Sequence, residues 1–75
     1  MPLKLSEVSL QDEVFEDVRD LQRITNQSRG KIYKDMQRNL LDRPIKLGKK
    51  SVWLRSQRID YMRKLIAASE AHMAA

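Results

Sequence analysis

The residues best able to do chemistry lie between positions 28 and 38, where cationic and hydrogen-bonding side chains surround a few apolar ones. Lysine and arginine can pair with phosphate oxygens or with guanine O6 and N7, and glutamine with adenine N6 and N7. If Ile32 faces inward, helical periodicity turns Gly30, Lys34 and Gln37 away from the core. The candidate nucleic-acid contacts in this segment are Ser28, Arg29, Gly30, Lys31, Tyr33, Lys34, Gln37 and Arg38.

The start of this segment has further features that suit a polyanion. Ser28 and Arg29 stand where free backbone N–H groups and the helix dipole favour a phosphate. Gly30 removes a side chain where a nucleic-acid backbone would approach closely. The alternative interpretation is an ordinary solvated helix face whose lysines serve solubility.

A second group of cations accompanies a predicted hairpin. Lys49 and Lys50 are placed at its tip, where they would contact the DNA backbone or the minor groove. Arg43 and Lys46 flank the hairpin and are candidates for further phosphate contacts. A charged hairpin tip is also common in proteins without such a role. Trp53 has two interpretations: a core anchor between the hairpin and the last helix, or an outward contact for a protomer or DNA.

Residues for enzymatic chemistry are scarce. The chain has no cysteine and one histidine, His72, near its C-terminus, so no His-based nucleophile or thiolate metal site can be assembled. The acidic residues between 12 and 20 lack the spacing of a calcium loop. We therefore expect neither enzymatic activity, nor a metal, nor a cofactor.

Charge is segregated along the 75 residues. Residues 1–27 carry three basic and six acidic side chains, a net charge of −3, whereas residues 28–75 carry twelve basic and four acidic ones, a net charge of +8. Such a field raises the local concentration of polyanions. The N-terminus lacks the pattern of a signal peptide, and no run approaches a membrane span. These features predict a cytoplasmic protein that associates with the nucleoid through DNA.

The elements that must position these residues are predicted from caps and periodicity. Asp17 is a plausible N-cap for a helix through Val18, Leu21 and Ile24. A polar turn follows, in which Asn26 suits the left-handed conformation and Ser28 caps a second helix from Arg29 to Arg38 or Asn39. Its inward stripe is Ile32, Met36 and Leu40.

Two strands and a last helix complete the pattern. Residues 44–47 and 51–54 suit strands joined by a turn at Gly48, Lys49 and Lys50. Ser56 is the expected cap of a helix reaching about Ser69, with Ile59, Met62 and Ile66 inward and Tyr61 and Leu65 beside them. This order predicts a mainly α fold with a small β-hairpin, a winged helix-turn-helix of the excisionase or MerR-like kind. The predicted domain spans residues 15–69 and is followed by a frayed tail at 70–75. The N-terminal arm, residues 1–14, is left unassigned, because its sequence suits either a short extended stretch or a frayed helix.

Two segments resemble a known family. Residues 25–33, TNQSRGKIY, resemble the TGLSRST[IL]Y turn and recognition helix of AlpA-like phage regulators and related excisionases. Residues 43–48, RPIKLG, resemble the entry of that family into its wing. The resemblance covers roughly residues 18–66. Gly30 and Lys31 replace the family's usual small hydroxyl pair, so it implies no base preference.

The resemblance implies a sequence-specific double-stranded DNA-binding protein of a phage or integrated element. It would act as an excisionase, or recombination directionality factor, and would also regulate transcription. A dedicated activator or repressor is the alternative within the same fold. A protein-interaction adaptor that uses the acidic first third, such as an antirepressor or inhibitor, is the alternative from another class. The expected partner is double-stranded DNA, with a cognate integrase and further copies on adjacent sites left open.

Overall fold

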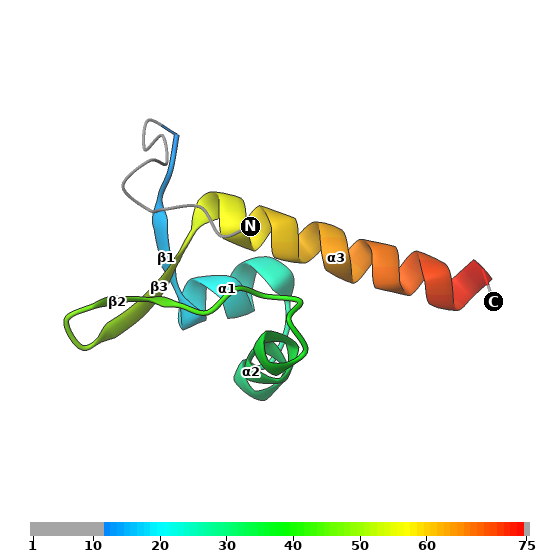
Figure 1. Cartoon of the computed structure of the whole chain (residues 1–75), viewed down its shortest axis with the longest axis horizontal. Helices are drawn as coiled ribbons and strands as arrows, with labels where there is room; N and C mark the ends of the chain where they lie inside the picture. The colour runs from blue at the N-terminus through cyan, green and yellow to red at the C-terminus, as the bar shows by residue number, and fades with distance from the viewer. Residues whose placement is uncertain (1–11, 75) are drawn as a thin grey trace.

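The computed structural model describes residues 12–74, and it combines three helices with a three-stranded antiparallel sheet (Figure 1). The elements are β1 (Phe15–Asp17), α1 (Val18–Thr25), α2 (Arg29–Gln37), β2 (Ile45–Leu47), β3 (Lys50–Leu54) and α3 (Arg55–Ala74). The mainly helical content and the hairpin confirm the sequence prediction at this level. Most of the N-terminal arm, residues 1–11, lies outside the described residues.

The two helices before the hairpin begin where the local signals predict, and α2 ends at Gln37, one or two residues before the predicted Arg38 or Asn39. Asp17 caps α1 in a capping box, in which the Asp17 side chain accepts from the Asp20 N–H and the Asp20 side chain accepts from the Asp17 N–H. Asn26 ends α1 in the left-handed region, at φ 55°. Ser28 caps α2 by accepting from the Lys31 N–H. The prediction for this segment is confirmed.

The sheet contains a strand that the sequence did not predict. β1 pairs with β3, Phe15 opposite Leu54 and Glu16 opposite Trp53, so β3 becomes the central strand in the order β1-β3-β2. The hairpin β2–β3 has a shorter turn than predicted, because Lys50 already pairs with Leu47. Gly48 takes the positive φ, 63°, that its place in this turn requires.

The core lies between the sheet and all three helices. Leu21, Ile32, Leu41, Trp53 and Tyr61 are buried together, and Val18, Met36, Leu40 and Leu65 pack against them. Trp53 is fully buried and its indole N–H donates to the Asp42 carbonyl at 2.7 Å. The core interpretation of Trp53 is therefore the correct one.

Helix α3 differs from its prediction in three respects. It begins at Arg55, so Ser56 lies in the first turn and is not the cap; the Leu54 N–H instead donates to the Gln57 side chain. Tyr61, predicted beside the inward face, lies fully in the core, whereas Ile66, predicted to face inward, is 56% exposed. The Tyr61 hydroxyl donates to the buried Asp35 carboxylate, a contact that hydrophobic periodicity does not reveal. The helix also continues beyond Ser69 to Ala74, through an alanine-rich segment of high helix propensity.

Candidate nucleic-acid interface

The outer face of α2 has the orientation that the sequence predicts. Ile32 is fully buried, and Gly30, Lys34, Gln37 and Arg38 are exposed. A Cβ at Gly30 would meet no atom within 4 Å, so the protein's own packing does not require glycine there. The outer face therefore offers two cations, an amide and a bare stretch of backbone to a ligand.

Lys31 is placed differently from its neighbours on this face. Its ammonium lies 2.6 Å from both carboxylate oxygens of Asp35, one helical turn later. The Asp35 side chain has no exposed surface, whereas that of Lys31 is 42% exposed. Lys31 therefore neutralises a buried carboxylate of its own helix, a role that the sequence did not predict for it.

A chain of buried and part-buried hydrogen bonds continues from Asp35 into α3. The Tyr61 hydroxyl donates to Asp35 Oδ2 at 2.6 Å, and the Gln27 amide donates to the same hydroxyl. The four residues Gln27, Lys31, Asp35 and Tyr61, named here the polar relay, connect the turn before α2, α2 itself and α3. Because a buried polar network is stable only when every member is satisfied, the polar relay fixes how α2 sits against α3.

The polar relay shifts two pKa values. Burial alone would raise the Asp35 pKa, but hydrogen bonds from Lys31 and Tyr61 outweigh burial and hold it below its usual 3.8. The Tyr61 pKa is raised, first by burial and then by its hydrogen bond to the Asp35 carboxylate. At neutral pH Asp35 is consequently ionised and the Tyr61 hydroxyl keeps its proton to donate.

A groove separates the start of α2 from the hairpin. Its volume is about 360 Å³, and its walls come from the β1–α1 junction, from α2 and from the hairpin. The lining residues are Asp17, Val18, Arg19, Arg29, Tyr33, Lys49, Lys50 and Ser51. The Arg29 guanidinium lies over the Tyr33 ring, 5.7 Å from its centroid, which restrains both side chains. We call this feature the interhelix–hairpin groove.

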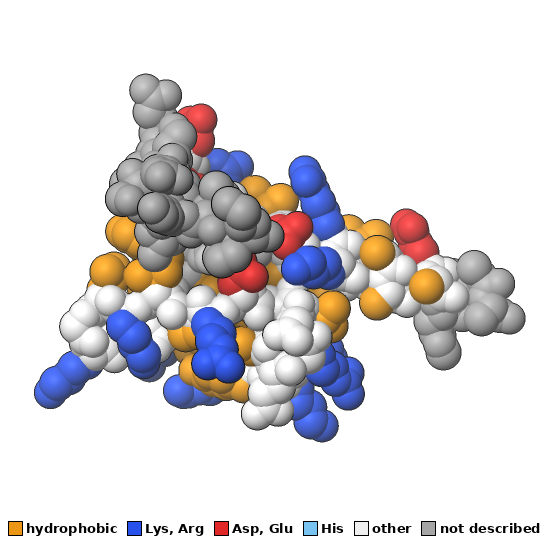
Figure 2. Space-filling model, viewed as in Figure 1, with side chains coloured by type: hydrophobic (Ala, Val, Ile, Leu, Met, Phe, Trp, Pro, Cys, Tyr) orange, Lys and Arg blue, Asp and Glu red, His pale blue; other side chains and the backbone are white. Residues whose placement is uncertain are grey.

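The remaining predicted contacts lie on or beside the hairpin. Lys49 and Lys50 are exposed and line the groove. Lys46 is exposed, and its ammonium donates to Ser51 Oγ across the two strands at 2.6 Å. Arg43 is exposed before β2. In the view of Figure 2, lysine and arginine side chains gather around the hairpin and below the body, where α2 lies in Figure 1.

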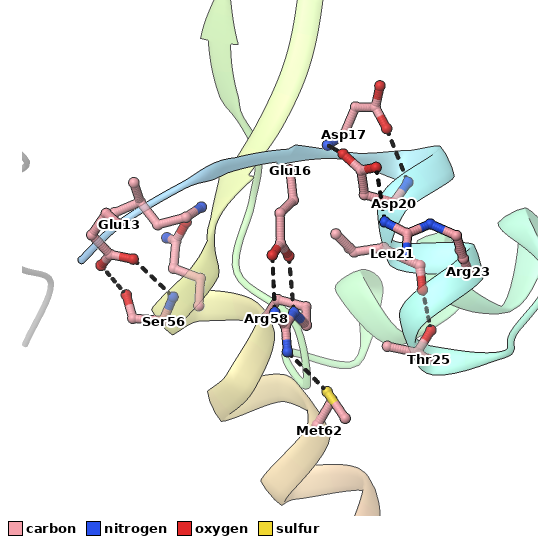
Figure 3. Close-up of polar contacts among 12 residues, drawn as sticks. Glu13, Glu16, Asp17, Asp20, Leu21, Arg23, Thr25, Ser56, Arg58 and Met62 are labelled. Carbon is pink, nitrogen blue, oxygen red and sulfur yellow. Dashed lines mark hydrogen bonds and ion pairs between the residues drawn. The ribbon is translucent and has the colours of Figure 1, made fainter. Parts of the chain in front are cut away.

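Four of the acidic side chains between residues 12 and 20 are engaged within the fold (Figure 3). Glu16, only 6% exposed, forms two 2.9 Å hydrogen bonds with the Arg58 guanidinium, and these bonds raise the Arg58 pKa. Glu13 accepts from the backbone and hydroxyl of Ser56 at the start of α3. Asp17 and Asp20 form the capping box of α1. These carboxylates hold β1 and α1 in place.

Sequence reasoning missed Arg19, Asp35 and Tyr61 as parts of the site. The Lys31–Asp35 spacing of four residues was a usable signal, since such pairs meet on one helix face. Nothing local marks Arg19, which reaches the site only because β1 places the start of α1 beside the hairpin.

The arrangement can bind anions and donate hydrogen bonds. Among the described residues no group of three or more histidine, cysteine, aspartate or glutamate side chains could hold a metal ion. None of the helices in residues 12–74 combines the length and apolar character needed to cross a membrane.

Comparison with known proteins identified no relative. No protein-family model matches the sequence, and neither a curated protein nor a solved structure gives a match.

Proposed function

We propose that the protein binds double-stranded DNA as a winged helix-turn-helix. In this proposal α1 and α2 form the helix-turn-helix, α2 enters the major groove, and the β2–β3 hairpin is the wing. The observation that carries the proposal is the exposed outer face of α2, with Lys34, Gln37 and Arg38 projecting opposite the buried Ile32. Donors on one face of a rigid helix are what base-edge recognition in the major groove needs.

The hairpin supports the same proposal. Its exposed tip lysines, Lys49 and Lys50, line one groove together with Arg29 of α2, so a duplex lying on α2 would also meet the wing. Contacts of this kind fix the register of a protein on DNA without specifying bases. Gly30 leaves the surface of α2 open for close approach of a DNA backbone.

The biological role we propose is that of an excisionase, or recombination directionality factor, which also regulates transcription. This step rests on the resemblance of residues 25–33 and 43–48 to AlpA-like regulators. A small module covers roughly 600–1,000 Å² of protein surface, so several protomers on adjacent sites would supply useful affinity. An excision assay with the cognate integrase separates this role from that of a dedicated activator or repressor: excision that does not depend on the protein leaves only regulation.

The adaptor alternative would use the acidic first third as its contact face. Of the described acidic side chains there, Glu13, Glu16, Asp17 and Asp20 each accept hydrogen bonds within the fold, which favours a structural role for these four over a docking role.

The test is selection of bound sequences from a pool of random duplexes, followed by affinity measurements on the enriched site. Lys34→Ala is expected to weaken binding roughly 5- to 150-fold, the cost of about 1–3 kcal/mol for one good base contact. Lys64→Ala is the matched control, because Lys64 lies on α3 and pairs with Asp60 at 3.2 Å. Failure to enrich any sequence, or equal losses in the two variants, would contradict the proposal.

A further inference from the structure

We infer that the interhelix–hairpin groove binds a phosphodiester of the DNA backbone, and that Arg19 of α1 is one of its ligands. This inference rests on the proposed function and adds to it a site that includes a residue from the first helix. The groove is built from three separate parts of the chain, and each part contributes at least one cation.

The charge balance of the groove favours an anion. Arg19, Arg29, Lys49 and Lys50 line it, against a single carboxylate, Asp17. That carboxylate already accepts the Asp20 backbone N–H, and this hydrogen bond is the main cause of its lowered pKa. Four cations around one occupied carboxylate leave a surplus of positive charge facing the groove.

The side chains of the groove also have the chemistry of a phosphate site. Guanidinium groups pair with phosphate oxygens through two parallel N–H donors. The cation–π contact with Tyr33 restrains the Arg29 guanidinium before a ligand arrives, so less conformational entropy is lost on binding. The hydroxyl of Ser51 adds a neutral donor at the hairpin wall.

The position of the groove identifies the source of the phosphate. It lies between the start of α2 and the proposed wing, so a strand that follows the edge of the major groove would cross it. A polymer backbone is therefore the better match than a free phosphate ion, which would use the same donors but gain nothing from the neighbouring surface of α2.

The test compares two arginines of the same helix. Arg19 lines the groove, whereas Arg23 is a highly exposed residue that pairs with Asp20 at 3.5 Å. Binding of each variant to the selected duplex is measured as a function of salt. Arg19→Gln is expected to reduce the log–log slope by about 0.9, the value for one phosphate contact, and to weaken binding to all sequences alike. Arg23→Gln is expected to leave the slope unchanged.

The outcomes separate this inference from the proposed function. A slope near zero for the unmodified protein would remove the DNA proposal itself. A normal slope that Arg19→Gln leaves unchanged would overturn only the assignment of Arg19 and the groove. Inorganic phosphate, added at matched ionic strength, is expected to displace the duplex no better than chloride does. Specific displacement by phosphate would mean that the groove takes a free anion, and would overturn the assignment to a polymer backbone.

Discussion

Replacing Tyr61 with phenylalanine tests the polar relay while leaving the aromatic ring in the core. The side chain is fully buried, and its hydroxyl both donates to the Asp35 carboxylate and accepts from Gln27. A hydrogen bond to a charged group contributes roughly 1.5–3 kcal/mol, and the substitution also leaves the Gln27 amide without this acceptor. We therefore expect the free energy of unfolding to fall by about 1.5–3 kcal/mol.

That loss is large for a chain of this size. A 75-residue protein has a stability of roughly 4–11 kcal/mol at ordinary values per residue. With about 4–8 °C per kcal/mol for a small domain, the melting temperature should drop by roughly 6–24 °C. Urea unfolding should show a lower midpoint with the same m value, because the surface exposed on unfolding hardly changes.

Tyr33→Phe is the matched control, because Tyr33 is only half-buried and lies beside Arg29 at the edge of the groove. It should change stability by less than about 0.5 kcal/mol, as surface substitutions usually do. If Tyr61→Phe were as stable as this control, the polar relay would not hold α2 against α3, and the reasoning would be refuted.

Two further predictions concern Asp35 and Lys31 of the polar relay, with Lys34 as the comparison for Lys31. Since the Asp35 pKa is lowered, its contribution to stability is present above the usual value of 3.8 and is lost as the pH falls through the folded-state pKa. Thermal unfolding should therefore show that Asp35→Asn is less stable than the unmodified protein near pH 7, and this difference in stability should shrink as the pH falls below about 4. A difference that stays the same down to pH 2 would show that the charge of Asp35 does not contribute to stability. Lys31→Met should cost about 1–3 kcal/mol in urea unfolding, because it leaves a buried carboxylate without its cation, yet should leave the affinity for the selected duplex almost unchanged. Lys34→Met should leave stability almost unchanged and weaken duplex binding roughly 5- to 150-fold, the cost of one lost base contact; equal losses of affinity in the two variants would make Lys31 a DNA contact as well.

The helices around the turn could be predicted from sequence because their signals are local. Asp17, Asn26 and Ser28 each act within three or four residues, through a cap or a left-handed turn, and the structure uses all three. The face of α2 also followed from periodicity, since Ile32 is buried and Lys34 and Gln37 are exposed.

What escaped prediction depends on residues distant in sequence. β1 has three residues and exists through its pairing with β3, so its sequence alone carries no strand signal. Helix α3 turns Tyr61 inward and Ile66 outward because a buried hydroxyl–carboxylate pair outweighs apolar periodicity. The same long-range assembly brings Arg19 to the groove and engages Lys31 with Asp35.

The most direct test of the central claim is the affinity of the purified protein for double-stranded DNA, measured across a range of salt concentrations. About five phosphate contacts, from the cations of α2 and the hairpin, predict a log–log slope of roughly −4 to −5. A slope near zero, or no binding to any duplex at low ionic strength, would contradict the account.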